Sequence, residues 1–119
     1  MRLLLVDDEE EFVTTLAERL TIRGFAVQYA TKATEALVLA GKSVYDIAVL
    51  DMKMPGIGGL QLREILEEKC PEMKFIFLTG HGSEDDYRAG STGAGYLVKP
   101  VDIGTLILKM NEVMAKRSR

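Results

Sequence analysis

Short apolar runs alternate with amphipathic stretches along the whole chain. Apolar runs without polar alternation are typical of parallel strands covered on both faces, whereas apolar spacings of three and four residues predict helices. The runs predict five strands, at Arg2 to Val6, Phe25 to Ala30, Asp46 to Leu50, Met73 to Leu78 and Gly95 to Val98. The second run has the most mixed polarity, so we expect it at an edge of the sheet.

The amphipathic stretches predict one helix after each strand, at Glu9 to Ile22, Ala33 to Ala40, Gly59 to Lys69, Glu84 to Ser91 and Ile103 to Lys116. Gly24, Gly41 and Pro71 are the expected stops of the first three helices. The fourth helix follows the N-cap candidate Ser83 but lacks a strong apolar face, so we expect it to be the least stable. The last helix has an inward stripe of Ile103, Leu106, Ile107, Met110 and Met114.

Strands and helices that alternate through short loops predict a doubly wound α/β fold, with a five-stranded parallel sheet and five helices. Residues 1–116 form one predicted domain. The polar tail 117–119 is either a true terminus or the start of a linker to an output domain.

Composition excludes several classes of protein. A net charge of −3 argues against direct nucleic-acid binding by this domain. No apolar stretch approaches the roughly 18 residues that a membrane span needs. The single cysteine, Cys70, excludes an internal disulfide and fits a reducing compartment, so we expect a cytoplasmic protein.

Polar side chains stand where four of the apolar runs end. Asp7 and Asp8 follow the first run, Asp51 the third, Thr79 the fourth and Lys99 the last. Because the carboxyl ends of parallel strands meet at one edge of a sheet, we expect these side chains to gather at one site. Acids at a strand end can also simply cap the next helix, an alternative that Asp7 and Asp8 alone leave open.

Clustered carboxylates must hold a proton or bind a cation, because two like charges 4 Å apart repel by about 4 kcal/mol at an effective dielectric near 20. Carboxylate oxygens at an open edge suit Mg²⁺. A carboxylate beside Mg²⁺ is either an inert ligand or a nucleophile toward phosphorus. Thr79 and Lys99 could contact a phosphoryl group placed there.

Four segments, Leu5 to Glu9, Val49 to Gly56, Leu78 to Gly80 and Tyr96 to Pro100, resemble the signature segments of response-regulator receiver domains. They occur in the right order and cover essentially the whole chain. The resemblance implies a flavodoxin-like sheet of strand order 2-1-3-4-5. It also implies a signalling switch of a two-component system rather than an enzyme. Such a switch catalyses only its own phosphorylation and dephosphorylation.

The resemblance implies a role for each acid. Asp51 would accept a phosphoryl group from a histidine kinase. Asp8, Asp51 and the backbone carbonyl of Lys53 would ligate Mg²⁺, and Asp7 would act through water.

The resemblance also implies roles for the remaining site residues. Thr79 and Lys99 would bind the phosphoryl oxygens, and Tyr96 would swing inward on activation. Lys53 and His81 are candidates for tuning dephosphorylation. The Lys99–Pro100 bond is cis in similar domains.

Two partners beyond the kinase are expected. Leu108 lies off the inward stripe, so it could join Tyr96 and the fourth helix in a homodimer face formed with the last strand and the last helix. Leu78 to Ser83 is similar to receivers attached to sigma-54-type transcriptional activators, which implies a fused output domain and transcription regulation.

Three alternatives compete with a phosphorylated receiver. A haloacid-dehalogenase-type hydrolase is disfavoured because Lys53, not an acid, stands two residues after Asp51. A flavin or dinucleotide binder is disfavoured because the five acids from Asp7 to Glu11 would repel phosphate. A degenerate receiver that acts as a phosphorylation-independent binding module remains the runner-up.

Overall fold

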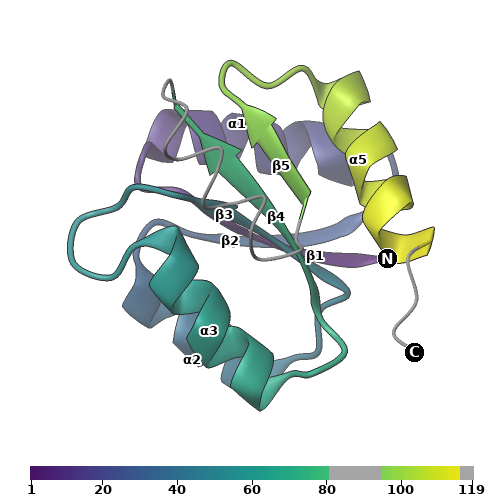
Figure 1. Cartoon of the computed structure of the whole chain (residues 1–119). Coiled ribbons are helices and arrows are strands. Elements are labelled where there is room, and N and C mark those ends of the chain that lie inside the picture. The colour runs from purple at the N-terminus through teal and green to yellow at the C-terminus, as the bar shows by residue number, and fades with distance from the viewer. Residues whose placement is uncertain (81–94, 116–119) are drawn as a thin grey trace.

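The computed structural model describes residues 1–80 and 95–115. Its centre is one parallel five-stranded sheet with strands in the order β2-β1-β3-β4-β5 (Figure 1). The strands are β1 (Arg2–Val6), β2 (Ala26–Ala30), β3 (Ile47–Asp51), β4 (Lys74–Thr79) and β5 (Gly95–Val98). This order, with β2 at an edge, confirms the predicted topology.

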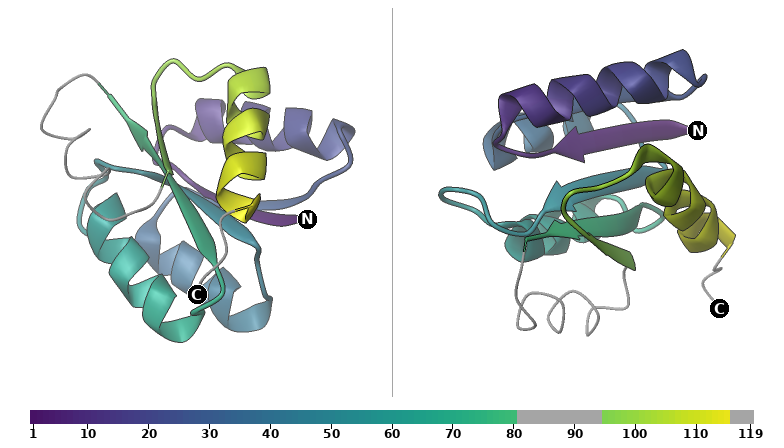
Figure 2. Two further views of the ribbon diagram at one scale, coloured as in Figure 1. Left: turned by 45° about the vertical axis from the view of Figure 1, so that its right-hand side comes forward. Right: turned by 90° about the horizontal axis from the view of Figure 1, so that it is seen from above.

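Within the described part of the chain, four helices flank the sheet: α1 (Glu10–Ile22), α2 (Ala33–Lys42), α3 (Gly59–Lys69) and α5 (Ile103–Ala115). α1 and α5 cover one face, and α2 and α3 cover the other (Figures 1 and 2). The predicted helix from Glu84 to Ser91, with its N-cap Ser83, lies outside the described residues, and so does the tail 117–119. None of the helices in the described ranges is both long and apolar enough to cross a bilayer.

The neighbouring inner strands β1 and β3 supply apolar side chains to both faces of the sheet. Leu4 and Val6 of β1 pack in the core under α2 and α3, whereas Leu3 and Leu5 pack in the core under α1 and α5. Every residue of β3 is buried. Full burial of one such aliphatic side chain contributes about 1.5–3 kcal/mol, so the carboxyl ends of these strands are firmly anchored.

Two details of the helices differ from the prediction. α2 continues through Gly41, the predicted stop, to Lys42, and the N–H of Ser43 closes the last turn by donating to the Leu39 carbonyl at 3.1 Å. One glycine inside a helix costs only about 1 kcal/mol relative to alanine, which is too little to end it. In α5, Val113 is buried although the predicted stripe left it out, and the predicted inward residues Ile103, Ile107 and Met114 are partly buried and pack against the same core.

The junction between β3 and α3 is tight. A Cβ atom added to Gly59, the first residue of α3, would overlap the carbonyl oxygen of Asp51 and lie 3.0 Å from Met52 Cα. The N–H of Gly59 donates to the Met52 carbonyl at 3.0 Å. The helix therefore begins in direct contact with the backbone at the end of β3, which only glycine permits.

Candidate functional site

Three carboxylates meet at the carboxyl edge of the sheet. β3 ends on Asp51, and Asp7 and Asp8 follow β1, which pairs with β3 through Val6 and Leu50. One oxygen from each of the three carboxylates lies within 4.8 Å of the others. Asp7 and Asp51 are buried, with 1% and 7% of their surface exposed, whereas Asp8 is exposed. The predicted gathering of these acids is confirmed.

Asp7 has two neighbours that fix its orientation. Its Oδ1 accepts a hydrogen bond from the N–H of Glu9 at 2.9 Å, which holds the turn before α1, whereas the N-cap of α1, Glu9, makes no side-chain capping bond. Its Oδ2 is buried and accepts no well-directed hydrogen bond within the described part of the chain, although Lys99 Nζ lies 2.8 Å away as an ion pair. An incompletely satisfied buried oxygen beside two further carboxylates is a donor set that suits a hard divalent cation. Asp7, Asp8 and Asp51 could therefore hold a metal ion.

Burial and charge raise the pKa of Asp51 to about 7. Removal from water is the largest cause, followed by the negative charge of Asp7, and the hydrogen bond with Asp8 acts in the same direction. Lys99 and the backbone N–H of Lys53 oppose the rise. Burial also raises the pKa of Asp7. Near neutral pH and without a cation, Asp51 is therefore only partly ionised.

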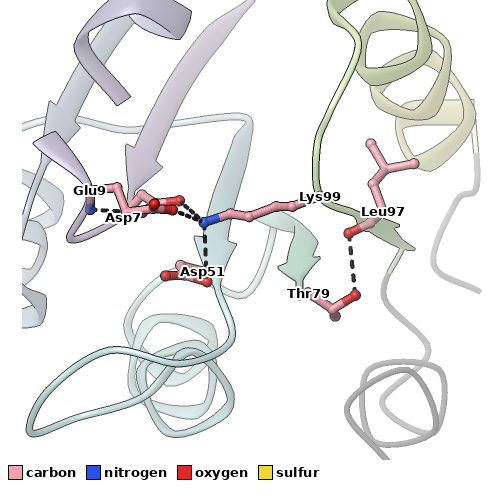
Figure 3. Close-up of polar contacts among 6 residues, drawn as sticks. All are labelled: Asp7, Glu9, Asp51, Thr79, Leu97 and Lys99. Carbon is pink, nitrogen blue, oxygen red and sulfur yellow. Dashed lines mark hydrogen bonds and ion pairs between the residues drawn. The ribbon is translucent and has the colours of Figure 1, made fainter. Parts of the chain in front are cut away.

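Lys99 reaches from the end of β5 to all of these groups. Its Nζ lies 2.7 Å from Glu9 Oε1, 2.8 Å from Asp7 Oδ2 and 3.7 Å from Asp51 Oδ1 (Figure 3). Burial lowers the pKa of Lys99, but the close carboxylates of Asp7 and Glu9 outweigh this and raise the pKa above its ordinary value, so the ammonium stays charged. The Lys99–Pro100 bond is cis, as the resemblance implies.

Thr79 lies at the same edge but is oriented toward β5. It is fully buried at the end of β4, and its hydroxyl donates to the Leu97 carbonyl at 3.5 Å (Figure 3). Leu97 precedes Val98, which pairs with Thr79, and it follows Tyr96, whose side chain remains 38% exposed. The hydroxyl is thus connected to the strand that carries Tyr96 and Lys99.

Two contacts of Lys99 were not predicted from the sequence. Glu9 accepts a hydrogen bond from its ammonium, and the ring centroid of Phe12 lies 4.9 Å from Nζ. Glu9 is one of five consecutive acids, and only its position directly after the Asp7–Asp8 pair distinguishes it. His81, the other candidate for tuning, lies outside the described residues.

Comparison with known proteins identifies the family. The family model for the response regulator receiver domain matches residues 3–111. The photosynthetic apparatus regulatory protein RegA of Cereibacter sphaeroides is 36% identical over 102 residues, which cover 84% of this chain and 55% of RegA. The transcriptional regulatory protein GlrR of Escherichia coli is 32% identical over 114 residues, covering 94% of this chain and 26% of GlrR. The chain thus spans about half or less of the length of these relatives.

Solved structures agree with the sequence comparison. A response regulator protein from Burkholderia pseudomallei, crystallised with a phosphorylated aspartic acid, calcium ion and citrate, superposes with a TM-score of 0.83. It is 32% identical, and the match covers 96% of this chain and 71% of that one. The family match runs from β1 into α5 and includes Asp7, Asp8, Asp51 and Lys99. The chain belongs to the family of response regulator receiver domains.

Proposed function

We propose that this domain is a phosphoryl-accepting switch, in which Asp51 takes a phosphoryl group from the phosphohistidine of a histidine kinase in a Mg²⁺-dependent reaction. The observation that carries the proposal is the buried Asp51 carboxylate, with two further carboxylates and the Lys99 ammonium beside it. The phosphorylated aspartic acid and calcium ion in the Burkholderia pseudomallei structure support it by analogy.

In the proposed transfer, an Asp51 carboxylate oxygen attacks the phosphorus of the phosphohistidine. An O–P bond forms while the P–N bond breaks, and the imidazole leaves with the electron pair and takes up a proton. Asp51 must be ionised to attack. Its pKa of about 7 means that much of the metal-free protein is not ready for the reaction at neutral pH.

Asp8, Asp51 and the backbone carbonyl of Lys53 would hold Mg²⁺, with Asp7 acting through water. The bound ion would neutralise the carboxylates and the equatorial phosphoryl oxygens and keep Asp51 ionised. Lys99 Nζ, 3.7 Å from Asp51 Oδ1, is close enough to donate to a phosphoryl oxygen on Asp51. Its raised pKa keeps it cationic for this purpose.

The response would begin at Thr79. Its hydroxyl would leave the Leu97 carbonyl for a phosphoryl oxygen, and Tyr96, one residue before Leu97, would turn inward from its half-exposed position. Lys53 and His81 would tune the lifetime of the phosphoryl group. The switched surface would include β5 and α5, where Leu108 is 71% exposed, and would serve a homodimer.

We infer the wider context from the relatives. RegA and GlrR are both longer than this chain, and their names describe regulatory proteins. A fused output domain that regulates transcription is therefore the expected recipient of the signal. The free thiol of Cys70 suits the reducing cytoplasm, where we place the domain.

The test is the intact mass of the protein after incubation with Mg²⁺ and acetyl phosphate. We expect a gain of one phosphoryl mass in the wild-type chain, and no gain without Mg²⁺ or in Asp51→Asn, which should remain folded. Purified histidine kinases provide a second donor. If neither donor modifies a folded protein, the domain is a phosphorylation-independent binding module and the proposal is wrong.

A further inference from the structure

Lys99 is held from the first turn of α1 as well as from the acid cluster. Glu9, which immediately precedes α1, accepts a hydrogen bond from Lys99 Nζ at 2.7 Å. Phe12, three residues later, presents its ring to the same ammonium, with the centroid 4.9 Å from Nζ. Residues three apart lie on the same side of a helix, so the two contacts reach Lys99 from one direction. The proposed reaction as described above gives neither residue a role.

The number of donors on the ammonium indicates what this contact does. Lysine carries three N–H donors. Glu9 and Asp7 are both within hydrogen-bond distance of Nζ, at 2.7 Å and 2.8 Å, whereas Asp51 Oδ1 at 3.7 Å is too far for a hydrogen bond. With one N–H donated to Glu9 and another facing Asp7 in the ion pair, a third is left for the side on which Asp51 lies. That is the side on which a phosphoryl oxygen bonded to Asp51 would stand.

Glu9 differs from Asp7 in an important respect. Asp7 belongs to the cluster that could hold the metal ion, so its charge is shared between the cation and Lys99. The backbone N–H of Glu9 bonds Asp7, but its carboxylate lies outside that cluster and pairs with Lys99. Glu9 is therefore the carboxylate that can hold the ammonium in the same place whether or not a cation is bound.

We propose that Glu9, supported by the ring of Phe12, is a positioning residue that fixes the Lys99 ammonium where its third N–H meets the phosphoryl group on Asp51. The inference rests on the proposed function, which it deepens. Both holding contacts are partly exposed, with 64% of the Glu9 side chain accessible, so each is individually weak. Loss of the Glu9 contact should slow phosphoryl acceptance about three- to tenfold rather than abolish it.

Three substitutions at Glu9 separate reach from charge. Glu9→Gln keeps the length and an acceptor oxygen but removes the charge. Glu9→Asp keeps the charge but is one methylene shorter, and Glu9→Ala removes both. Glu11→Gln is the matched control, since it removes the same charge from the same helical turn and Glu11 has no contact with Lys99 in the described structure. Phe12→Leu keeps an apolar side chain and removes the ring.

The measurement is the rate at which each folded variant gains one phosphoryl mass on Asp51, over a range of acetyl phosphate concentrations in saturating Mg²⁺. Positioning predicts a lower maximal rate for Glu9→Asp and Glu9→Ala than for Glu11→Gln, about twofold slowing in Phe12→Leu, and substantial recovery in Glu9→Gln. Thermal unfolding and calorimetric Mg²⁺ titration, made without a phosphodonor, should give the same midpoint and affinity for Glu9→Asp as for the wild type.

Two results would overturn the inference. One is that Glu9→Asp and Glu9→Ala react as fast as Glu11→Gln or faster, which would mean that Glu9 only repels the anionic donor or competes for Lys99. The other is that Glu9→Gln is as slow as Glu9→Ala. A wild-type chain that gains no phosphoryl mass would instead contradict the proposed function itself, so the two failures can be told apart.

Discussion

β3 and β5 both end at the site, but they are built differently. Every residue of β3 is buried between helices on its two faces, whereas β5 alternates between half-buried and exposed positions at the edge of the sheet. β3 carries Asp51, and β5 leads into Lys99 and carries Leu97, which accepts the Thr79 hydroxyl bond. Asp51, which would receive the phosphoryl group, thus stands on the well-packed strand, and Tyr96, which would respond, stands on the weakly packed one. Local opening favours regions with few buried contacts, so we expect motion to concentrate in β5.

The largest loss of stability is expected from a substitution in the well-packed strand β3. Leu50→Ala removes a fully buried side chain next to Asp51 and leaves a cavity in the core under α2 and α3. We expect it to lower the free energy of unfolding by about 2–5 kcal/mol, as measured by urea denaturation. A loss below about 1 kcal/mol would show that β3 is less tightly packed than its burial indicates.

Asp51→Asn should stabilise the metal-free protein, and by more at higher pH. The pKa of Asp51 is raised from 3.8 to about 7 in the folded state, so its protonated form stabilises the fold below pH 4, and this stability is lost as pH rises through about 7. Asparagine does not titrate. With EDTA present, we expect the variant to gain on the order of 2 kcal/mol over the wild type between pH 4 and pH 8, by urea unfolding. Added Mg²⁺ should reduce the gain, and a difference independent of pH would contradict the raised pKa.

Thr79→Ala, at the end of β4, should remove the side-chain link between the site and β5. The variant loses the hydroxyl that donates to the Leu97 carbonyl, at a cost of about 1 kcal/mol in stability. Asp51 should remain modifiable by acetyl phosphate, but the response of β5 should weaken. Amide hydrogen exchange over Gly95–Val98, compared before and after phosphorylation, reports that response. Thr79→Ser keeps the hydroxyl and should behave like the wild type; an undiminished response in Thr79→Ala would rule out the proposed link.

The smallest effect is expected at β5 itself. Val98→Ala also removes apolar atoms, but from a side chain that is 43% exposed on the edge strand. The stability should change by no more than about 0.5 kcal/mol. Measured under the same urea conditions, Val98→Ala and Leu50→Ala together quantify the difference in packing between β5 and β3. Equal losses of unfolding free energy in the two variants would show that the strands are packed equally well.

Most of the fold could be predicted from the sequence because each strand and helix is indicated by the pattern of apolar residues within its own segment. The uninterrupted apolar runs of β1 and β3 indicated burial on both faces, and the acids at their ends indicated an edge site. Gly41 misled because one glycine costs a helix only about 1 kcal/mol, so α2 continues one residue beyond it. The roles assigned to Asp51, Thr79 and Tyr96 remain predictions.

The contacts of Lys99 could not be predicted because they depend on the path of a long side chain across the site. Glu9 is equivalent in sequence to Glu10 and Glu11, and only the turn after β1 brings its carboxylate to Nζ. The direction of the Thr79 hydroxyl is likewise a choice among rotamers that no pattern along the chain encodes. The sequence thus indicated where the site lies, but not which of its side chains contact one another.

The tight start of α3 has a consequence for anyone who maps this domain by saturation mutagenesis. Gly59 carries no functional group, yet any side chain there would press on the backbone that presents Asp51. Such a scan should therefore rank position 59 among the least tolerant of the chain, beside the acids of the site. Without the structure, position 59 would be taken for a catalytic position. Its intolerance instead reflects how closely the start of α3 packs against the end of β3.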